Sequence, residues 1–171
     1  MLGLTPLGTI HTLISLIAVI TGFAAVIRDR RIDPSNGLGR TYLIATVVTC
    51  LTALGIFQHG GFGKPHALAI ITLVVLGVAG VARRTSLFGG TARYVETVGY
   101  SATLFFHMVP AVAETATRLP PGAPWAASPD APVVQSITAA LFVVFLLGAA
   151  LQVRRLRASG PAIRIVPTIE L

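Results

Sequence analysis

Charged side chains are scarce in this chain of 171 residues: they make up 11% of it, while 54% of the residues are hydrophobic. Soluble domains carry charges on about a quarter of their residues, so this chain has too few to cover a water-soluble surface. Acidic residues are fewer than basic ones: 6 Asp and Glu against 13 Lys and Arg give a formal net charge of +7. A mean hydropathy of +0.81 argues against a soluble nucleic-acid-binding protein despite that positive charge.

Cysteine is almost absent as well. The single thiol, Cys50, lies in an apolar stretch, which excludes an internal disulfide and a zinc site built from cysteines. No Ser-His-Asp, paired-carboxylate or Cys-His arrangement is recognisable, so nothing in the sequence predicts hydrolase or transferase chemistry. Residues 1–9 contain no Lys or Arg, so we expect the first apolar run to be retained and not removed as a secretory signal.

Long apolar runs are what the chain does have. About 20 helical residues are needed to cross a bilayer core about 30 Å thick, and the apolar runs are close to this length. They predict an all-α, polytopic transmembrane helical bundle in a single domain over residues 1–153. A basic tail follows over residues 154–171. The expected spans are Leu7–Ile27, Thr41–Gln58, His66–Ala82, Tyr94–Ala113 and Val133–Val153. The alternative is four spans, with the last apolar run lying on the membrane surface, but that run does not look amphipathic.

The basic residues fix a predicted orientation, because Lys and Arg concentrate in cytoplasmic loops. With five spans, 11 of the 13 fall on one side and only Lys64 and Arg118 on the other. We therefore expect the N-terminus outside and the tail in the cytoplasm. The expected lipid partner of the basic tail is an anionic headgroup.

Small and polar residues predict which helix faces turn inward, since membrane helices pack through such residues. At helical spacing, four of the five spans carry a stripe of this kind, whereas the fifth lacks one and is expected to be peripheral to a four-helix core. The stripes are His11, Ser15, Ala18, Gly22 and Ala25; Val48, Thr52, Gly55 and His59; His66, Ile70, Leu73, Gly77 and Gly80; and Glu96, Tyr100, Thr103, His107, Pro110 and Glu114.

The four histidines all fall in the predicted outer half of the membrane or at its outer surface. His11, His66 and His107 come from three helices and lie within roughly one helical turn of the same depth. Ionisable residues at this depth usually face a bundle interior and are functional candidates, and imidazole is a common ligand of metals and haem. These three residues are therefore the predicted ligands of haem b or a transition metal, with His59 as a weaker metal ligand and Glu114 as a residue that orients an imidazole.

Simpler interpretations stay open. Histidines near helix ends can be interfacial residues bonded to water, headgroups or a neighbouring Ser or Thr. Glu114 and Arg118, spaced i, i+4, are most simply a helix-end ion pair, and Glu96 is expected to pair with Arg93 at the interface.

The function is then either electron transfer or redox sensing at a histidine site, or that of a cofactor-free accessory or scaffold subunit associated with other membrane subunits or with copies of itself. A small transporter is less favoured, because no inverted repeat is evident.

The Gly39-Arg40-Thr41-Tyr42 sequence that opens the second span, together with His11, His66 and His107, resembles a family of small bacterial multi-span proteins of unknown function. The resemblance covers residues 7–119. Members typically carry a His-Arg pair a few residues before a similar Gly-Arg-x-Tyr, whereas this chain has Ser35-Asn36 there. The resemblance implies a bacterial inner-membrane protein and implies no particular chemistry.

Overall fold

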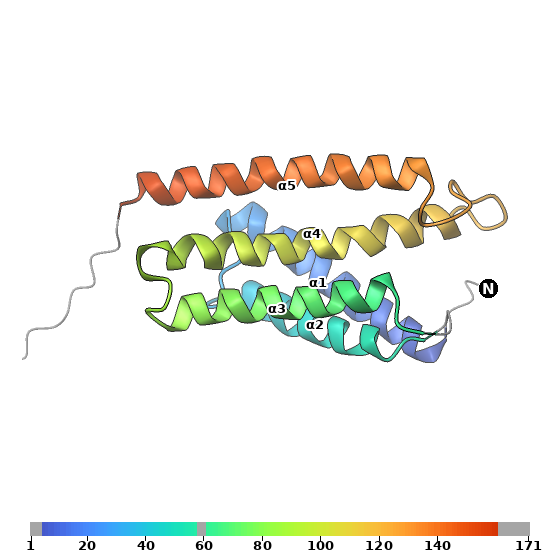
Figure 1. Ribbon diagram of the computed structural model, residues 1–171, viewed down its shortest axis with the longest axis horizontal. Helices are drawn as coiled ribbons and strands as arrows, with labels where there is room; N and C mark the ends of the chain where they lie inside the picture. Colours follow the sequence, from blue (N-terminus) through green and yellow to red (C-terminus); the bar gives the residue numbers. More distant parts are fainter. Residues whose placement is uncertain (1–4, 58–60, 161–171) are drawn as a thin grey trace, which may run out of the picture.

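The computed structural model describes residues 5–57 and 61–160, and these form five α-helices with no strand among them. The helices are α1 (Pro6–Asp29), α2 (Gly37–Leu54), α3 (Lys64–Arg84), α4 (Ala92–Arg118) and α5 (Pro132–Ala158), with a short 3-10 turn, η1 (Gly89–Thr91), before α4. Figure 1 shows the five α-helices running roughly along one axis, with successive helices in opposite directions. The predicted all-α bundle is confirmed.

Local signals explain where the helices begin. The Thr5 hydroxyl accepts a hydrogen bond from the Gly8 amide at the start of α1, and the Asn36 side chain accepts one from the Gly39 amide at the start of α2. Such caps satisfy amides that have no partner within the helix. The Asn36 cap starts α2 at Gly37, four residues before the predicted start at Thr41, and the helix ends at Leu54. The predicted end of this span, Gln58, lies outside the described residues.

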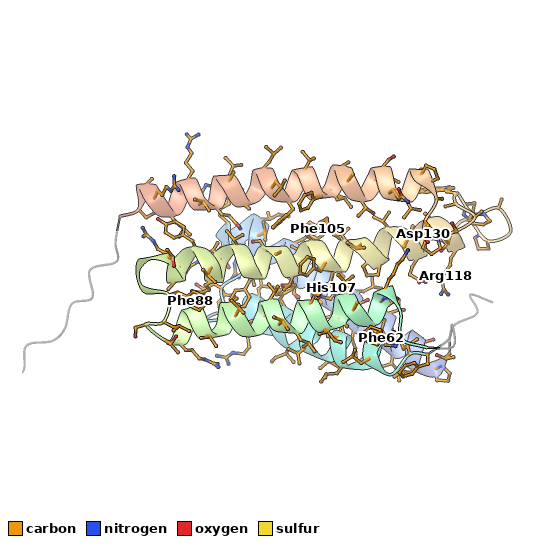
Figure 2. All side chains as sticks on the ribbon, in the orientation of Figure 1. Phe62, Phe88, Phe105, His107, Arg118 and Asp130 are labelled. Carbon is orange, nitrogen blue, oxygen red and sulfur yellow. The ribbon has the colours of Figure 1, made fainter. Side chains whose placement is uncertain are left out.

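The arrangement is a four-helix core with α5 on its outside, as predicted. Helices α1, α2, α3 and α4 pack in a ring, whereas α5 packs against α4 alone among the described helices. In Figure 1, α5 lies along one edge of the molecule, next to α4. Phe105 of α4 stacks on Phe145 of α5 with ring centroids 5.6 Å apart. Figure 2 labels Phe105 on the side of α4 that faces α5 and His107 on the side that faces the core.

Within residues 5–57 and 61–160, four helices are long and apolar enough to cross a membrane: α1, α2, α3 and α5. The last apolar run is thus a spanning candidate. The fourth predicted span, Tyr94–Ala113, lies within α4, which is more polar and is not among these four. Helix α4 is 27 residues long and carries buried Tyr100, Thr103 and His107. These polar side chains of α4 face the other core helices and not the lipid. A long helix of modest hydropathy can therefore pack inside an otherwise apolar bundle.

The inward faces were predicted correctly for α1, where Ala18, Gly22 and Ala25 are buried. The stripes predicted for α2 and α3 were wrong except at His66, which is buried, and at Thr52, which contacts His11. The residues buried on α2 are Gly39, Tyr42, Ala45, Thr46, Thr49 and Cys50, and those on α3 are His66, Ala69, Thr72, Leu76, Ala79 and Ala82. Each helix is therefore rotated relative to the prediction, which had followed Val48 and Gly55 on α2 and the glycines on α3.

Close approach of α3 and α4 depends on a glycine of α4. A Cβ atom added at Gly99 would lie 3.0 Å from the Ala79 Cβ, whereas one added at Gly77 would meet nothing within 4 Å. Gly77, a member of the stripe predicted for α3, is exposed, so the glycine that allows this contact belongs to the partner helix.

The basic segment after residue 153 begins as helix. Helix α5 continues to Ala158, so Arg154, Arg155 and Arg157 lie on its last turns. Near the same end, Gln152 accepts a hydrogen bond from Ser101 of α4 and donates one to the Arg30 carbonyl beyond α1, at 2.9 and 3.0 Å. This glutamine is 8% exposed and ties the peripheral helix to the core.

Candidate functional site

A row of polar side chains on α2 joins the core helices. Tyr42, Thr46, Thr49 and Thr52 are spaced three or four residues apart and so share one helix face. The Tyr42 hydroxyl and Thr103 Oγ1 of α4 are 2.7 Å apart, and both residues are 0% exposed. Each of the two histidines that point into the core contacts this same row, which makes the α2 face the centre of the candidate site.

His11 of α1 contacts the outer part of the row. Its Nδ1 is 3.1 Å from the Thr49 carbonyl oxygen and 3.0 Å from Thr52 Oγ1. A carbonyl oxygen only accepts, so Nδ1 carries the proton and donates. Nε2 then keeps a free lone pair, which is the protonation pattern of an imidazole that binds a metal through Nε2.

His107 of α4 contacts the row one turn further in. Its Nε2 lies 3.0 Å from Thr46 Oγ1, and its ring meets the Tyr42 ring edge-on, with centroids 6.2 Å apart. His107 is 8% exposed and Thr46 is 0% exposed. His107, a predicted cofactor ligand, thus bonds a neighbouring threonine through Nε2, as the simpler interpretation of these histidines allows.

His66 occupies a different environment. It is the third residue of α3, and its Nδ1 accepts a hydrogen bond from the Gly63 amide at 3.2 Å. The proton of the neutral ring is then on Nε2, which is buried without a hydrogen-bond partner among the described residues. Phe57 and Phe62 lie against the ring, with centroids 4.7 and 5.3 Å away. His66 therefore offers no free lone pair to a metal in this state.

The structure brings His11 and His107 to one helix face but does not assemble the predicted group of three. Among residues 5–57 and 61–160, no three His, Cys, Asp or Glu side chains are placed to hold a metal ion. His59 lies outside the described residues. Glu114 forms an ion pair with Arg118 at the end of α4, and its side chain is 57% exposed. The simpler prediction of a helix-end ion pair is therefore the one that the geometry supports, and the ligand-orienting role has no geometric support.

A haem clasped between His11 and His107 would require rearrangement. Ligation through His107 Nε2 would break its bond to Thr46, and the closely packed side chains around it, among them Thr46 and Thr103 at 0% exposed, would have to move to admit the ring. Protein interiors are close-packed, and such expansion costs free energy. The packing in this structure therefore does not fit a haem between these two histidines.

The Gly39-Arg40-Thr41-Tyr42 sequence has a structural explanation at the other end of the bundle. A Cβ atom on Gly39 would lie 2.0 Å from the carbonyl oxygen of Asp33, so only glycine fits there. Arg40 is exposed at the start of α2, and Tyr42 is buried in the core and bonded to Thr103.

Arg83 ties three segments together at this end. Its guanidinium contacts Glu96 of α4 at 2.5 Å, Ser35 Oγ at 2.5 Å and Asp33 at 3.6 Å. The predicted pairing of Glu96 with Arg93 is wrong, because Arg93 bonds the Tyr94 hydroxyl and the Gly160 carbonyl. Burial disfavours ionisation of Asp33, but its hydrogen bonds with Ser35 and Arg31 outweigh this and keep the pKa of Asp33 below its usual value.

Beside this cluster, a groove of about 390 Å³ separates α2 from α3. Arg40, Arg83 and Arg84 line it together with apolar side chains, and Tyr100 of α4 also borders it. The sequence patterns predicted no site here. The available signals in the sequence were Arg40 and the Arg83-Arg84 pair, which the topology places at the same end of the bundle.

Comparisons with protein-family models, with curated proteins and with solved structures find no match for this chain. The resemblance carried by Gly39-Arg40-Thr41-Tyr42 and the histidines therefore stays a prediction, and function is argued from the residues themselves.

The buried Tyr42–Thr103 contact gives a prediction with a direction. Thr103 donates to the Tyr100 carbonyl at 2.8 Å, so the Tyr42 hydroxyl is the donor to Thr103. Thr103→Val removes this acceptor from the buried hydroxyl, whose second hydrogen-bonding neighbour is Thr46, and is expected to cost about 0.5–1.5 kcal/mol of the free energy of unfolding. Unfolding in detergent with increasing denaturant measures the cost; a variant as stable as the parent would contradict a contribution of this bond to the core.

Proposed function

We propose that this integral membrane protein is a cofactor-free accessory or scaffold subunit of a bacterial inner membrane. Four apolar helices of spanning length fit an integral membrane protein. The proposal for its role rests on one observation: the polar groups of the core bond one another. Tyr42 bonds Thr103, Thr46 bonds His107 and Thr52 bonds His11.

These bonds join α2 to both α1 and α4, and they give the histidines a structural role. Interhelical hydrogen bonds between Ser, Thr and His side chains stabilise and orient membrane helices. A rigid core whose polar groups are largely paired is what a scaffold needs. A carrier of redox chemistry instead needs ligand positions that are open.

The proposed orientation has the N-terminus outside and the C-terminal segment in the cytoplasm. The connection 30–36, the connection 85–91 and the end of α5 lie at one end of the bundle (Figure 1). Arg30, Arg31, Arg83, Arg84 and Arg155 are at or beside this end, and an excess of arginine is typical of the cytoplasmic side.

One observation favours a second candidate, a redox site for haem b or a transition metal. The free Nε2 lone pair of His11 follows from its Nδ1 contact with the Thr49 carbonyl, and His11 is only half-buried. His107 joins such a site only if its bond to Thr46 breaks. Electron transfer or redox sensing would then be the function.

The visible spectrum and metal content of the purified protein separate the two candidates. We expect a colourless, metal-free preparation in mild detergent from cells supplied with haem and transition metals, because His107 Nε2 bonds Thr46 and His66 Nδ1 accepts a hydrogen bond from the Gly63 amide. His107→Ala is expected to lower the thermal transition without any spectral change.

A Soret band or a stoichiometric metal would overturn the scaffold proposal. In that case His11→Ala and His107→Ala would abolish the signal, and His66→Ala serves as the matched control. His66 is buried as His107 is, at 4% against 8% exposed, but its Nδ1 is occupied by the Gly63 amide, so its removal would leave a cofactor at the other two histidines in place.

A further inference from the structure

We propose that the groove between α2 and α3 binds the headgroup and one acyl chain of an anionic phospholipid. The groove has a volume of about 390 Å³ and is bordered by α2, α3 and α4. The proposal is independent of whether the core histidines hold a cofactor, since the groove lies at the opposite end of the bundle from His11.

Positive charge gathers at one end of the groove. Arg40 begins α2 and Arg84 ends α3, and both line the groove. Both are exposed, and neither forms an ion pair within residues 5–57 or 61–160. Arg83, in contrast, is already paired with Glu96. Two uncompensated guanidinium groups on facing helices suit a phosphate, which they can bind through several hydrogen bonds.

Tyr100 supplies an independent observation. The residue is 3% exposed and lines the groove. Its hydroxyl is 4.0 Å from the position that a Cβ on Gly80 would occupy, and Gly80 lines the groove too. This hydroxyl has no hydrogen bond in the described part of the chain, and it is not one of the fully buried atoms there that lack a partner, so it is accessible from the groove that Tyr100 lines. A phosphate or glycerol oxygen in the groove would accept a hydrogen bond from it.

The rest of the groove is apolar, which favours a lipid over a free anion. Ile44 and Val47 follow Arg40 on α2 at spacings of four and seven residues, and all three line the groove. The rise of a helix places Val47 about 10 Å from Arg40 toward the bundle centre. The groove thus has arginines at the membrane-surface end and apolar side chains further toward the bundle centre. A phospholipid has the same arrangement, with its phosphate at the membrane surface and its acyl chain below.

Native mass spectrometry of the full chain in mild detergent, titrated with phosphatidylglycerol, tests the proposal. We expect one tightly bound phosphatidylglycerol and no comparable binding of phosphatidylcholine. The double variant Arg40→Gln/Arg84→Gln is expected to lose about 25-fold in affinity, because each arginine near an anionic lipid contributes about fivefold.

The double variant Arg154→Gln/Arg155→Gln is the matched control. It removes the same charge at the same end, from exposed positions on α5, and we expect it to keep the affinity within about twofold of the parent. An equal loss in both double variants would show diffuse attraction and overturn the proposal. Displacement of phosphatidylglycerol by millimolar inorganic phosphate would overturn the lipid assignment in favour of a free anion.

Gly80→Leu tests the groove without touching its charges. Its Cβ has room, since the nearest atom is the Tyr100 hydroxyl at 4.0 Å, and its remaining atoms would fill the groove. We expect lost phosphatidylglycerol binding with an unchanged thermal transition in lipid-free detergent. Retained binding in this variant would contradict a lipid lying between α2 and α3.

Discussion

Gly39→Ala is expected to destabilise the bundle by at least about 1–3 kcal/mol, the usual cost of an added methyl group in a closely packed site. The new Cβ would lie 2.0 Å from the Asp33 carbonyl oxygen and 2.4 Å from its carbon. Both are backbone atoms, which cannot rotate away as a side chain can. Either α2 or the connection before it has to move.

That movement would disturb more than the local turn. Asp33 contacts Arg83 of α3, and Arg83 holds Glu96 of α4, so the shift would reach three helices at this end of the bundle. Thermal unfolding in detergent measures the loss, and weakened phosphatidylglycerol binding is expected with it because Arg40 follows Gly39 directly.

Gly37→Ala is the matched control. Gly37 is also in the first turn of α2, but a Cβ there meets nothing within 4 Å. Alanine in a helix is more favourable than glycine by up to about 1 kcal/mol, so this variant is expected to be neutral or more stable. Equal destabilisation by the two substitutions would mean that the contact with Asp33 is not what requires glycine at position 39.

The existence of the helices could be predicted from the sequence because length and hydropathy alone decide it. Runs such as residues 7–27 and 133–153 have no other stable state in a bilayer, where every backbone polar group needs an internal partner. The packing order of the core helices could also be predicted from the sequence, because short connections make successive helices antiparallel neighbours. The fifth helix was placed outside the core because it lacks a polar stripe.

The inward faces of α2 and α3 could not be predicted from small and polar residues alone. In a membrane both the lipid-facing and the buried sides of a helix are apolar, so periodicity of hydrophobic residues carries little information. Gly77 is small yet exposed, whereas Ala69 and Ala79 are buried. On α2 the deciding feature was the hydrogen bonding of Tyr42 and Thr46, which depends on partners 61 residues away.

The same limit applies to the candidate sites. Shared depth brought His11 and His107 to one region of the core, and depth follows from the position of a residue in its helix. Which nitrogen is occupied depends on threonines of another helix, and the sequence does not contain that information. The groove was missed for a related reason: it is made by Arg40 and Arg84 of two different helices, and neither residue indicates a site without the other.

Gly22→Ala is expected to cost about 1–3 kcal/mol through overpacking of the core. A Cβ on this residue of α1 would lie 2.8 Å from Cδ2 of the Tyr42 ring and 2.8 Å from Cδ1 of Leu104. Leu104 can change rotamer, but Tyr42 is 0% exposed and held by Thr103. The substitution therefore has to push α1 away from α2 and α4, which would also lengthen the contacts of His11 with Thr49 and Thr52.

Gly77→Ala separates this steric effect from the general effect of alanine in a helix. Gly77 lies in the interior of α3 with nothing within 4 Å of an added Cβ, so its replacement is expected to be neutral or to stabilise by up to about 1 kcal/mol. Thermal unfolding of both variants in the same detergent gives the comparison. If Gly22→Ala proves as stable as Gly77→Ala, α1 is not seated against Tyr42 in the membrane, and the contact between His11 and the α2 row would lose its structural basis.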